Sequence, residues 1–512
     1  MLRRQFSLIH VRKATFYNQF STMTSLFQSL VENTSSYIFY AASVILSLAL
    51  ISISHCFYFR LITKLYNLPP GTMGYFPLIG ETLTFLKLKE KFTFQRHSKY
   101  GRVYKTHIFG SPTVRVCGSD NIRTLMMGDT KILQVFWPPS TQSLVGSYSL
   151  AVSSGNHHRQ HKSLLLKTMT PSKLKSHLDH FQTTASEKIE SWINSGIIDP
   201  VQQCRDMTVR SVIKYFIRND LDESVIQKLI KEITTFEKNL MSIPLNIPGT
   251  GFYKSMKARA EICSIIRSVL CQNNKETKCQ AQPKDFLNSL HCMLQENRDG
   301  NIERKIEDSI LEIIFAGNLT TTVSSFSTLY LLANHPKVLQ KLREELNEFG
   351  LMSHDGIHYP IVTQDHIPKL NYLQCVFKEI LRRLPPVGGV YRKVVKPFQL
   401  EGYTIPANWR VVCSIRDQHI GDSTFDNPMT FNPDRWLETA DDHSAFDFIP
   451  FGAASRRCVG KDFARLSILY TILELARRAQ WKMQPSTVKI DFIPAPKPME
   501  EMTAIFERYK HE

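Results

Sequence analysis

The sequence predicts a mainly α-helical fold with small β-sheets, an α+β chain in which one large body follows an N-terminal extension. Three observations predict it. Apolar residues recur at helical spacing from about Glu303 to Asn334, and the pattern between Pro200 and Gly300 is also helical. Alternating apolar and polar residues mark a short hairpin near residues 103–116. The 512 residues exceed the usual size of a single core, yet no Gly/Ser linker or low-complexity tract divides them.

Charge and cysteine usage narrow the class of protein. Lysine and arginine exceed aspartate and glutamate by 17, but no Arg-rich tract or zinc-finger spacing accompanies them, so we expect no nucleic-acid partner. The excess charge instead suits an anionic membrane or an acidic protein partner. The ten cysteines include no Cys-x-x-Cys pair, which favours a reducing compartment and argues against a disulfide scaffold or a zinc site.

Residues 1–36 form a basic, hydroxyl-rich tail that could serve as a mitochondrial presequence. Its basic residues are Arg3, Arg4, Arg12 and Lys13, against a single acid, Glu32. Met23 is a second candidate start, because initiation there would remove all four basic residues and leave a short, nearly uncharged tail. The sequence leaves Met1 and Met23 both open as the start.

Residues 37–59 are expected to form a transmembrane anchor. They contain no acid, lysine or arginine over 23 positions, enough for about 30 Å of hydrocarbon at about 1.5 Å per residue. A buried core helix is the alternative. Arg60 and Lys64 follow the span, which favours a cytosolic location for the rest of the chain.

The chain after the anchor divides into a hinge and a body. Residues 60–72 are basic and proline-rich and contain Leu68-Pro69-Pro70-Gly71, which breaks any helix and forms a stiff elbow. The body, residues 73–512, begins with the hairpin signal, two alternating stretches separated by Gly-Ser-Pro. An irregular segment at 131–155 mixes apolar and small residues, so it is either a pocket cap or a surface loop.

Three further helical patterns carry polar residues at informative spacings. His158 and Lys162 lie four apart and so share one helix face, which is either a binding feature or a solvated basic face. Residues 336–350 form an amphipathic, charge-rich helix that we expect to be exposed. Glu379 and Arg382 lie three apart on another helix, ahead of a double proline and, further on, Arg435.

The centre of the 303–334 helix is unusually polar. Gly317, Thr320 and Thr321 interrupt an otherwise apolar stretch. A helix that is simply buried gains no stability from such residues. A groove beside bound oxygen would gain, since a small residue leaves room and a hydroxyl donates a hydrogen bond.

Cys458 is the strongest candidate for chemistry. It follows Arg456 and Arg457 in a loop of small residues and precedes a helix-forming stretch. Guanidinium charge and the amide donors at a helix start both lower a thiol pKa, and the thiolate is the form that binds iron. The small residues at 452–455 would let the backbone lie flat against a planar ligand. A buried cysteine before an amphipathic helix is the alternative.

Phe451, Arg456, Cys458 and Gly460 stand at the spacing Phe-x-x-Gly-x-Arg-x-Cys-x-Gly, so the chain resembles the cytochrome P450 family. The resemblance runs from the hinge to the carboxyl end and implies the cytochrome P450 fold, a helical body around haem b behind an N-terminal membrane helix. It implies that Cys458 is the axial iron ligand and that Phe451 and Gly460 belong to the haem seat. Ala454 replaces the usual glycine and is expected to carry a small steric strain.

The same resemblance implies roles for residues outside the cysteine loop. Arg456 and Arg392 would pair with haem propionates, and His158 and Lys162 stand where the family typically has Trp and Arg for that purpose. The structural triad beneath the haem would be Glu379, Arg382 and Arg435.

One departure concerns oxygen activation. Gly317, Thr320 and Thr321 match the family motif Ala-Gly-x-Asp/Glu-Thr-Thr, but Leu319 replaces the acid. In the family that carboxylate helps to relay protons, so its loss is expected to slow O–O cleavage or to release hydrogen peroxide. Thr320 with ordered water, organised by Asn318, could substitute for it.

Several runs, among them YKTHIFGSPTVRV and KEILRRLPPVGGVYR, are similar to the animal retinoic acid hydroxylases. This similarity implies an elongated apolar substrate that ends in a carboxylate. Trp137 and Val387 would line the pocket and Arg115 would meet the acid, although Ser111 replaces a second arginine of that subfamily. A strand arginine that faces water is the alternative for Arg115.

The resemblance therefore implies a membrane-anchored haem-thiolate monooxygenase that inserts one atom of O₂ into a lipophilic, retinoid-like acid. Its partners would be the lipid bilayer, the small lipophilic substrate and an NADPH-dependent flavoprotein reductase. The reductase would dock on a basic face formed by Arg456, Arg457, Lys461 and Arg465. The expected location is the endoplasmic reticulum membrane with a cytosolic catalytic domain, and a mitochondrial location is the alternative.

Two other functions stay open. Because Leu319 replaces the proton-relaying acid, the chain could instead be a haem-thiolate isomerase or dehydratase that acts on hydroperoxides without a reductase. The departures at Ala454, Leu319, His158 and Lys162, taken together, also allow a catalytically idle member that binds haem or lipid.

Overall fold

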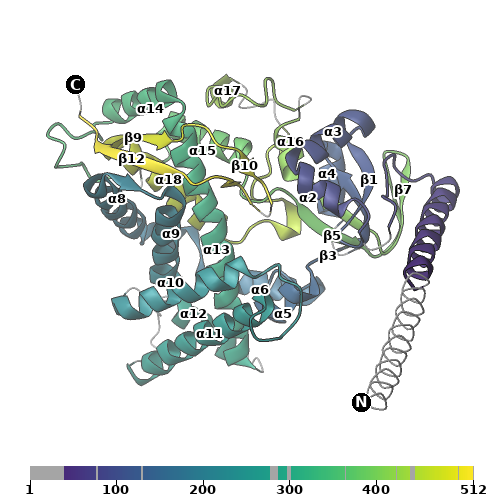
Figure 1. Cartoon of the computed structure of the whole chain (residues 1–512). Coiled ribbons are helices and arrows are strands. Elements are labelled where there is room, and N and C mark those ends of the chain that lie inside the picture. The colour runs from purple at the N-terminus through teal and green to yellow at the C-terminus, as the bar shows by residue number, and fades with distance from the viewer. Residues whose placement is uncertain are drawn as a thin grey trace, which may run out of the picture.

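The computed structural model describes residues 40–510, except 77–78, 129–130, 219, 277–285, 297–300, 364, 422–423, 439–443 and 494. A largely helical body stands beside a single N-terminal helix, and the carboxyl terminus lies on the side of the body away from that helix (Figure 1). The tail at 1–36 and both candidate starts lie outside the described residues.

The N-terminal helix spans Tyr40–Tyr66 and is long and apolar enough to cross a membrane. It continues through Arg60 and Lys64, past the predicted end of the anchor, so the first part of the predicted hinge is helical. The chain turns only at Asn67, which has a positive φ of 45°. Its amide then donates to the carbonyl of Gly402 in the body.

The end of this helix is packed against the body. His55 and Phe59 are buried, and their rings lie 5.5 Å from the ring of His107 and 6.1 Å from that of Trp409, respectively. Gly71 in the proline elbow forms a β-bridge with Lys105, where a Cβ atom would lie 2.0 Å from the Lys105 carbonyl oxygen. The elbow is therefore part of the packed body, and the helix leaves that body in a defined direction.

The largest sheet has five strands in the order β1-β2-β8-β5-β3. Its strands are β1 (Val103–Ile108), β2 (Ser111–Val116), β3 (Leu133–Val135), β5 (Val390–Val394) and β8 (Arg410–Cys413). The predicted β1–β2 hairpin is confirmed, with its turn at Phe109 and Gly110, both at positive φ. Strand β8 joins β2 in parallel, which brings the carboxyl-terminal half of the chain onto the hairpin.

Three smaller sheets complete the β structure, as the fold class predicts. A three-stranded sheet contains β4 (Ile197–Ile198), β12 (Thr503–Arg508) and β9 (Ala479–Gln484). Two pairs are β6 (Phe398–Leu400) with β7 (Tyr403–Ile405), and β10 (Ile490–Asp491) with β11 (Lys497–Pro498).

The central helix α13 spans Ile302–Ala333, within one residue of the prediction, and runs through the middle of the body in Figure 1. It packs against α9 (Pro200–Phe216) and α18 (Lys461–Arg478). Several of its hydroxyls bond within the helix, since Thr320, Ser324 and Thr328 each donate to the carbonyl four residues earlier. A helix with many hydroxyls can therefore lie in an apolar core. The buried hydroxyls of Thr321, Ser325 and Ser327 have no partner among the described residues.

The other described helices lie around α13 or, like α2, α3 and α4, beside the large sheet (Figure 1). They are α2 (Thr82–Leu88), α3 (Glu90–Tyr100), α4 (Ser119–Met127), α5 (Pro139–Val145), α6 (Gly155–Thr168), α7 (Pro171–Lys175), α8 (Leu178–Ser195), α10 (Glu223–Lys238), α11 (Gly251–Glu276), α12 (Phe286–Glu296), α14 (Pro336–Glu348), α15 (Asn371–Arg383), α16 (Ile415–His419) and α17 (Arg435–Glu438). The predicted helical character between 200 and 300 is confirmed for the described part of that region.

Two predictions about individual elements need correction. The 131–155 segment is less irregular than expected, because it contains β3 and α5. Helix α14 is not exposed all round: its leucines at 339, 342 and 346 are buried. Arg343 is buried too, and its guanidinium donates to the carbonyls of Ala476 and Ala479, so α14 caps the end of α18.

Candidate active site

The loop that carries Cys458 is a closed bend held by its own backbone. The amide of Cys458 donates to the carbonyl of Phe451 at 2.9 Å, and Gly452 donates to Ile449 at 2.9 Å. A single 3₁₀ turn at Ala454–Arg456 lies inside the bend, and α18 begins three residues after the cysteine. The Cys458 thiol is thereby fixed close to the start of α18.

Two residues in the bend adopt left-handed backbone. Gly452 has φ +66°, which glycine tolerates, and Ala454 has φ +52°. A left-handed residue with a Cβ atom costs about 1–2 kcal/mol relative to ordinary backbone. The strain predicted at Ala454 is confirmed.

The Cys458 side chain is solvent accessible, although protein surrounds it closely. Burial raises the pKa of its thiol above the ordinary value, and this outweighs the lowering by the Gly460 amide and by the charges of Lys162 and Arg457. The lowered pKa predicted from sequence is therefore wrong for the chain alone. Coordination to a metal ion would itself remove the proton from such a thiol.

Helix α6 is tied to the cysteine loop by Lys162. Its ammonium donates to the carbonyls of Ser455 and Arg457 at 2.7 and 2.8 Å. His158, one turn earlier, is only 4% exposed. The predicted pair therefore lies next to the loop, with Lys162 as a clamp on its backbone and His158 packed inside.

One stripe of α13 borders open space. Ala316 is exposed although it lies at the centre of the helix, while its neighbours Ile314 and Asn318 are buried. The hydroxyl of Thr320 donates to the Ala316 carbonyl at 2.7 Å, so these two residues share that stripe.

Two other motif residues lie on the packed sides of α13. A side chain at Gly317 would point toward Val212 of α9, whose Cγ2 atom would lie 3.5 Å from the added Cβ. Thr321 is buried, and its hydroxyl has no hydrogen-bond partner among the described residues. The small residue that leaves room is thus Ala316 rather than Gly317, because α9 covers the bare face of the glycine.

Asn318 cannot organise water beside Thr320 in this arrangement. It is fully buried, its amide donates to Glu237 at 2.7 Å, and its carbonyl accepts from Thr208 at 2.8 Å. Asn318 and Thr320 are two residues apart and therefore point to nearly opposite sides of the helix. These bonds link α9, α10 and α13 on the side away from Ala316. Burial raises the pKa of the Glu237 carboxyl to about 7.

The predicted Glu379 network is present and fully buried. The Glu379 carboxylate accepts both ends of the Arg382 guanidinium at 2.8 Å and Nε of Arg435 at 3.2 Å. It also accepts from the indole of Trp436 and the amide of Asn432. The donors belong to α15, to α17 and to the segment leading into α17, so the network fixes α17 and that segment against α15.

The residues expected to meet substrate have separate places. Arg115 is buried in β2 and binds Asp417 at 3.1 Å and the hydroxyl of Ser414 at 3.0 Å. Cross-strand pairing puts Arg115 on the opposite face of the sheet from Arg392, because Arg115 pairs with Val412 and Arg392 with Val411. The carboxylate that Arg115 meets in the structure is therefore that of Asp417, and the water-facing alternative is wrong.

The other two such residues lie in the 131–155 segment and beside the large sheet. The indole of Trp137 donates to the Ala151 carbonyl at 3.1 Å, which closes the 131–155 segment on itself. Val387 is partly buried next to the core between the large sheet and α4. Arg392 is 9% exposed, and its guanidinium donates to the Tyr391 carbonyl at 3.1 Å.

Sequence reasoning missed two acids on α13, Asp308 and Glu312. Asp308 accepts the Tyr148 amide, and Glu312 accepts the amides of Leu150 and Ala151. The signal was available, because two acids four residues apart in an apolar helix need partners on one side.

Comparison with known proteins identifies the architecture. The sequence pattern of the family described as cytochrome P450 matches residues 69–501. The chain belongs to the cytochrome P450 family. A cytochrome P450 26B1 from Danio rerio is 34% identical over 429 residues and spans 82% of each chain. The Homo sapiens cytochrome P450 26B1 is 32% identical over 447 residues and spans 86% of each.

A solved structure shows the same fold. The retinoic-acid-bound cyanobacterial CYP120A1 is 27% identical to this P450 and superposes with a TM-score of 0.77. The match covers 86% of this chain and 99% of that chain. P450 enzymes are monooxygenases that hold haem through a cysteine thiolate and receive NADPH-derived electrons through a reductase, so this P450 is a haem monooxygenase.

The residues of this P450 fit a haem. The only side chains between positions 452 and 455 are methyl and hydroxymethyl groups, which leaves the bend flat beside the accessible Cys458 thiol. Ala316 and Thr320 on the exposed stripe of α13 also carry small side chains. A sulfur ligand, small walls and nearby cations form the donor set that a planar anionic porphyrin requires.

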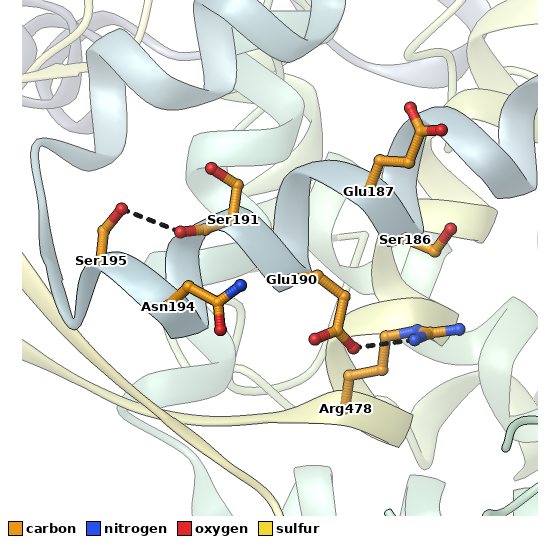
Figure 2. Close-up of a pocket in the computed structure, with 7 residues that line it drawn as sticks. All are labelled: Ser186, Glu187, Glu190, Ser191, Asn194, Ser195 and Arg478. Atoms are coloured by element: carbon orange, nitrogen blue, oxygen red, sulfur yellow. Dashed lines mark hydrogen bonds and ion pairs between the residues drawn. The ribbon is translucent and has the colours of Figure 1, made fainter. Parts of the chain in front are cut away.

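The surface pocket of about 590 Å³ on α8 is unrelated to this chemistry (Figure 2). It is lined by Ser186, Glu187, Glu190, Ser191, Asn194, Ser195 and Arg478. Its principal charges are paired, since Arg478 binds Glu190 at 2.8 Å. No residue of the cysteine loop or of the α13 stripe reaches it.

Proposed function

We propose that this P450 hydroxylates an elongated lipophilic substrate of the retinoid type. The observation that carries the proposal is the likeness to a P450 solved with retinoic acid, which extends over almost the whole catalytic body. The sequence runs shared with the animal retinoic acid hydroxylases, including the Trp137 segment, support the same class.

In this proposal Cys458 is the axial ligand of the haem iron, and the bound haem supplies the activation of O₂. Arg456 and Arg392 balance the propionates, Phe451 and Gly460 shape the seat, and Lys162 holds the cysteine loop in place through two carbonyls. His158 supports α6 from inside. Removal of the Lys162 clamp is expected to loosen the loop rather than to remove a propionate contact.

Thr320 is proposed to hold and pass the proton that oxygen activation consumes. Its hydroxyl lies on the accessible stripe and is bonded to the Ala316 carbonyl, which fixes its direction. Gly317 and Thr321 would assist only by allowing α9 to pack closely. Leu319 offers no acid at the neighbouring position, so protons must reach Thr320 from solvent through this stripe.

The acidic end of a retinoid would need a partner other than Arg115. That guanidinium is already balanced by Asp417, so it gives little attraction to a second carboxylate. We therefore propose that Trp137 and Val387 recognise the apolar length of the substrate, and that a neutral retinoid is accepted as readily as its acid.

Electron delivery and location follow from the same proposal. Arg457 is exposed beside Cys458, and Lys461 and Arg456 are partly exposed, so an acidic face of a flavoprotein reductase would dock there. Arg465 contributes less, because it donates to Gln374. The Tyr40–Tyr66 helix would anchor the enzyme in the endoplasmic reticulum membrane, with residues 73–512 as the cytosolic catalytic domain.

A hydroperoxide isomerase or dehydratase is the second candidate function. It is favoured by Leu319 together with the inward position of Asn318, since neither residue supplies a proton relay. Such chemistry needs no reductase.

One experiment separates the two functions. Purified full-length protein is titrated with retinoids, fatty acids and sterols while the haem spectrum is followed, and the tightest binder is then incubated with ¹⁸O₂, NADPH and reductase. The proposal predicts a retinoid product that carries one labelled oxygen and requires NADPH. Turnover of a hydroperoxide without reductant, and no labelled retinoid, would establish the second function instead.

A further inference from the structure

The segment 146–153, here called the lid segment, connects α5 to α6 and lies against α13. Glu312 accepts hydrogen bonds from the backbone amides of Leu150 and Ala151, both at 2.6 Å. Two adjacent backbone amides therefore converge on the two oxygens of one carboxyl group. Leu150 and Val152 then pack against the main core.

A second acid, one turn earlier, holds the start of the lid segment. Asp308 is fully buried and accepts the Tyr148 amide at 3.0 Å. At Gly146, which has φ +94°, a Cβ atom would lie 2.1 Å from the Asp308 carboxylate, so only glycine allows this approach. Arg259 of α11 neutralises Asp308 and donates to the Leu144 carbonyl at 2.7 Å.

These contacts connect the lid segment to the exposed stripe of α13, formed by Ala316 and Thr320, and to Trp137, which is proposed to touch substrate. Glu312 lies four residues before Ala316 on α13, and Ala316 is followed four residues later by Thr320. On the other side, the Ala151 carbonyl accepts the Trp137 indole at 3.1 Å. Ala151 is therefore held by Glu312 through its amide and holds Trp137 through its carbonyl.

We propose that Glu312 is a positioning residue that latches the lid segment to the central helix and thereby sets the place of Trp137 in the substrate site. Without the latch, the segment loses two of its attachments to α13, and Trp137 loses a fixed acceptor. Substrate affinity should fall while the chemistry at Thr320 persists. The affinity part of this inference rests on the proposed function, whereas the latch itself does not.

The surroundings of Glu312 also give the latch a pH dependence. Burial raises the pKa of its carboxyl to about 7 with help from Asp308, against the lowering effect of the Leu150, Ala151 and Ser149 donors. The charged and titratable groups around the lid contacts include Arg259 of α11 on Asp308, His161 of α6 bonded to Ser309, and Lys305 and His157 beside the Tyr148 ring.

The sign of this dependence follows from linkage. The carboxyl binds its proton more tightly in the closed state than it would in an open, hydrated one, so protonation favours closure. Closure is fully favoured below the ordinary glutamate pKa and weakens as pH rises through about 7. Glu312→Gln keeps one acceptor oxygen but has no titratable proton, so it should remove this dependence.

The test compares full-length wild type with Glu312→Ala, Glu312→Gln and the matched control Glu303→Gln, an exposed acid on the same helix. Amide hydrogen exchange is measured at Leu150 and Ala151, and substrate affinity is measured from the haem spectral shift about one pH unit above and below 7. We expect exchange at both amides to rise about tenfold or more in Glu312→Ala, because that variant leaves both amides without their acceptor. The control should match wild type.

Substrate affinity gives the second part of the result. Wild-type affinity should weaken from the lower to the higher pH, Glu312→Gln should be insensitive to pH, and Glu312→Ala should bind weakly at both while kcat changes little. Unchanged exchange in Glu312→Ala, or a wild-type pH dependence in Glu312→Gln, would overturn the proposal. If no compound shifts the wild-type spectrum, the proposed function fails, and the exchange experiment alone still decides the latch.

Discussion

Ala454 shows how a single methyl group can matter in the cysteine loop. Its φ of +52° is a conformation that glycine adopts freely and that alanine adopts only with strain. The preceding residue, Ala453, has extended backbone with φ −141° and carries no such strain. The two alanines therefore form a matched pair.

Ala454→Gly should stabilise the folded protein by about 1 kcal/mol, the left-handed strain of about 1–2 kcal/mol less the greater backbone entropy of glycine in the unfolded chain. Ala453→Gly should be neutral or destabilising, because it adds that entropy and relieves nothing. Thermal unfolding of haem-loaded protein checks both. A lower midpoint for Ala454→Gly would show that the methyl group makes compensating contacts.

Leu319→Glu tests the missing proton donor. We expect more hydroxylated product per NADPH and less hydrogen peroxide, because a positioned general acid typically contributes about 10²- to 10⁴-fold. Product and peroxide are measured together in the same reaction. Leu319→Gln is the control, since it adds a polar group of the same size without an ionisable proton. Equal behaviour of Glu, Gln and Leu at this position would mean that Thr320 and solvent suffice.

At the scale of elements, the segment before α17 depends on one buried acid. Glu379 has no exposed surface and gathers the charges of Arg382 and Arg435. Removing one partner of such a network leaves the others buried without compensation.

Glu379→Ala should therefore lower the free energy of unfolding by about 3–5 kcal/mol, or prevent accumulation of folded protein. The matched control is Glu344→Ala on α14, an exposed acid whose loss should cost less than about 1 kcal/mol. Denaturant unfolding of both variants provides the measurement. A loss at Glu379 no larger than that at Glu344 would contradict a structural role for the network.

Elements were predictable where the signal is local. The helical periodicity of the 32-residue α13 and the alternation of β1 and β2 depend on neighbouring residues, and the structure places them as expected. The length of the N-terminal helix was not predictable from the sequence. Arg60 and Lys64 marked its expected end, whereas the helix continues to Tyr66, and Phe59 packs against Trp409.

The direction of single side chains was predictable only in part. Glu379 and Arg382 lie three residues apart on one helix and therefore share a face whatever the rest of the fold, so their pairing followed from spacing. Arg115 and Asn318 were misjudged because their partners, Asp417 and Glu237, lie far away in the sequence and are brought near only by packing. The predicted lowering of the Cys458 thiol pKa was wrong for the same reason, because burial depends on how the whole chain packs.

On the scale of the whole molecule, the N-terminal helix, the large sheet and the helical body are packed together. His55 and Phe59 of that helix contact His107 of β1 and Trp409, and α13 joins the lid segment to the exposed stripe of Ala316 and Thr320. The direction in which the N-terminal helix leaves the body is therefore fixed by its contacts with the large sheet.

The central claim is that Cys458 binds the haem iron, and the carbon monoxide difference spectrum of the reduced, purified protein tests it most directly. The account predicts a Soret band at the wavelength for which the family is named, and loss of that band in Cys458→Ala with the fold retained. A band at that wavelength in Cys458→Ala, or a wild-type protein that never takes up porphyrin, would contradict it.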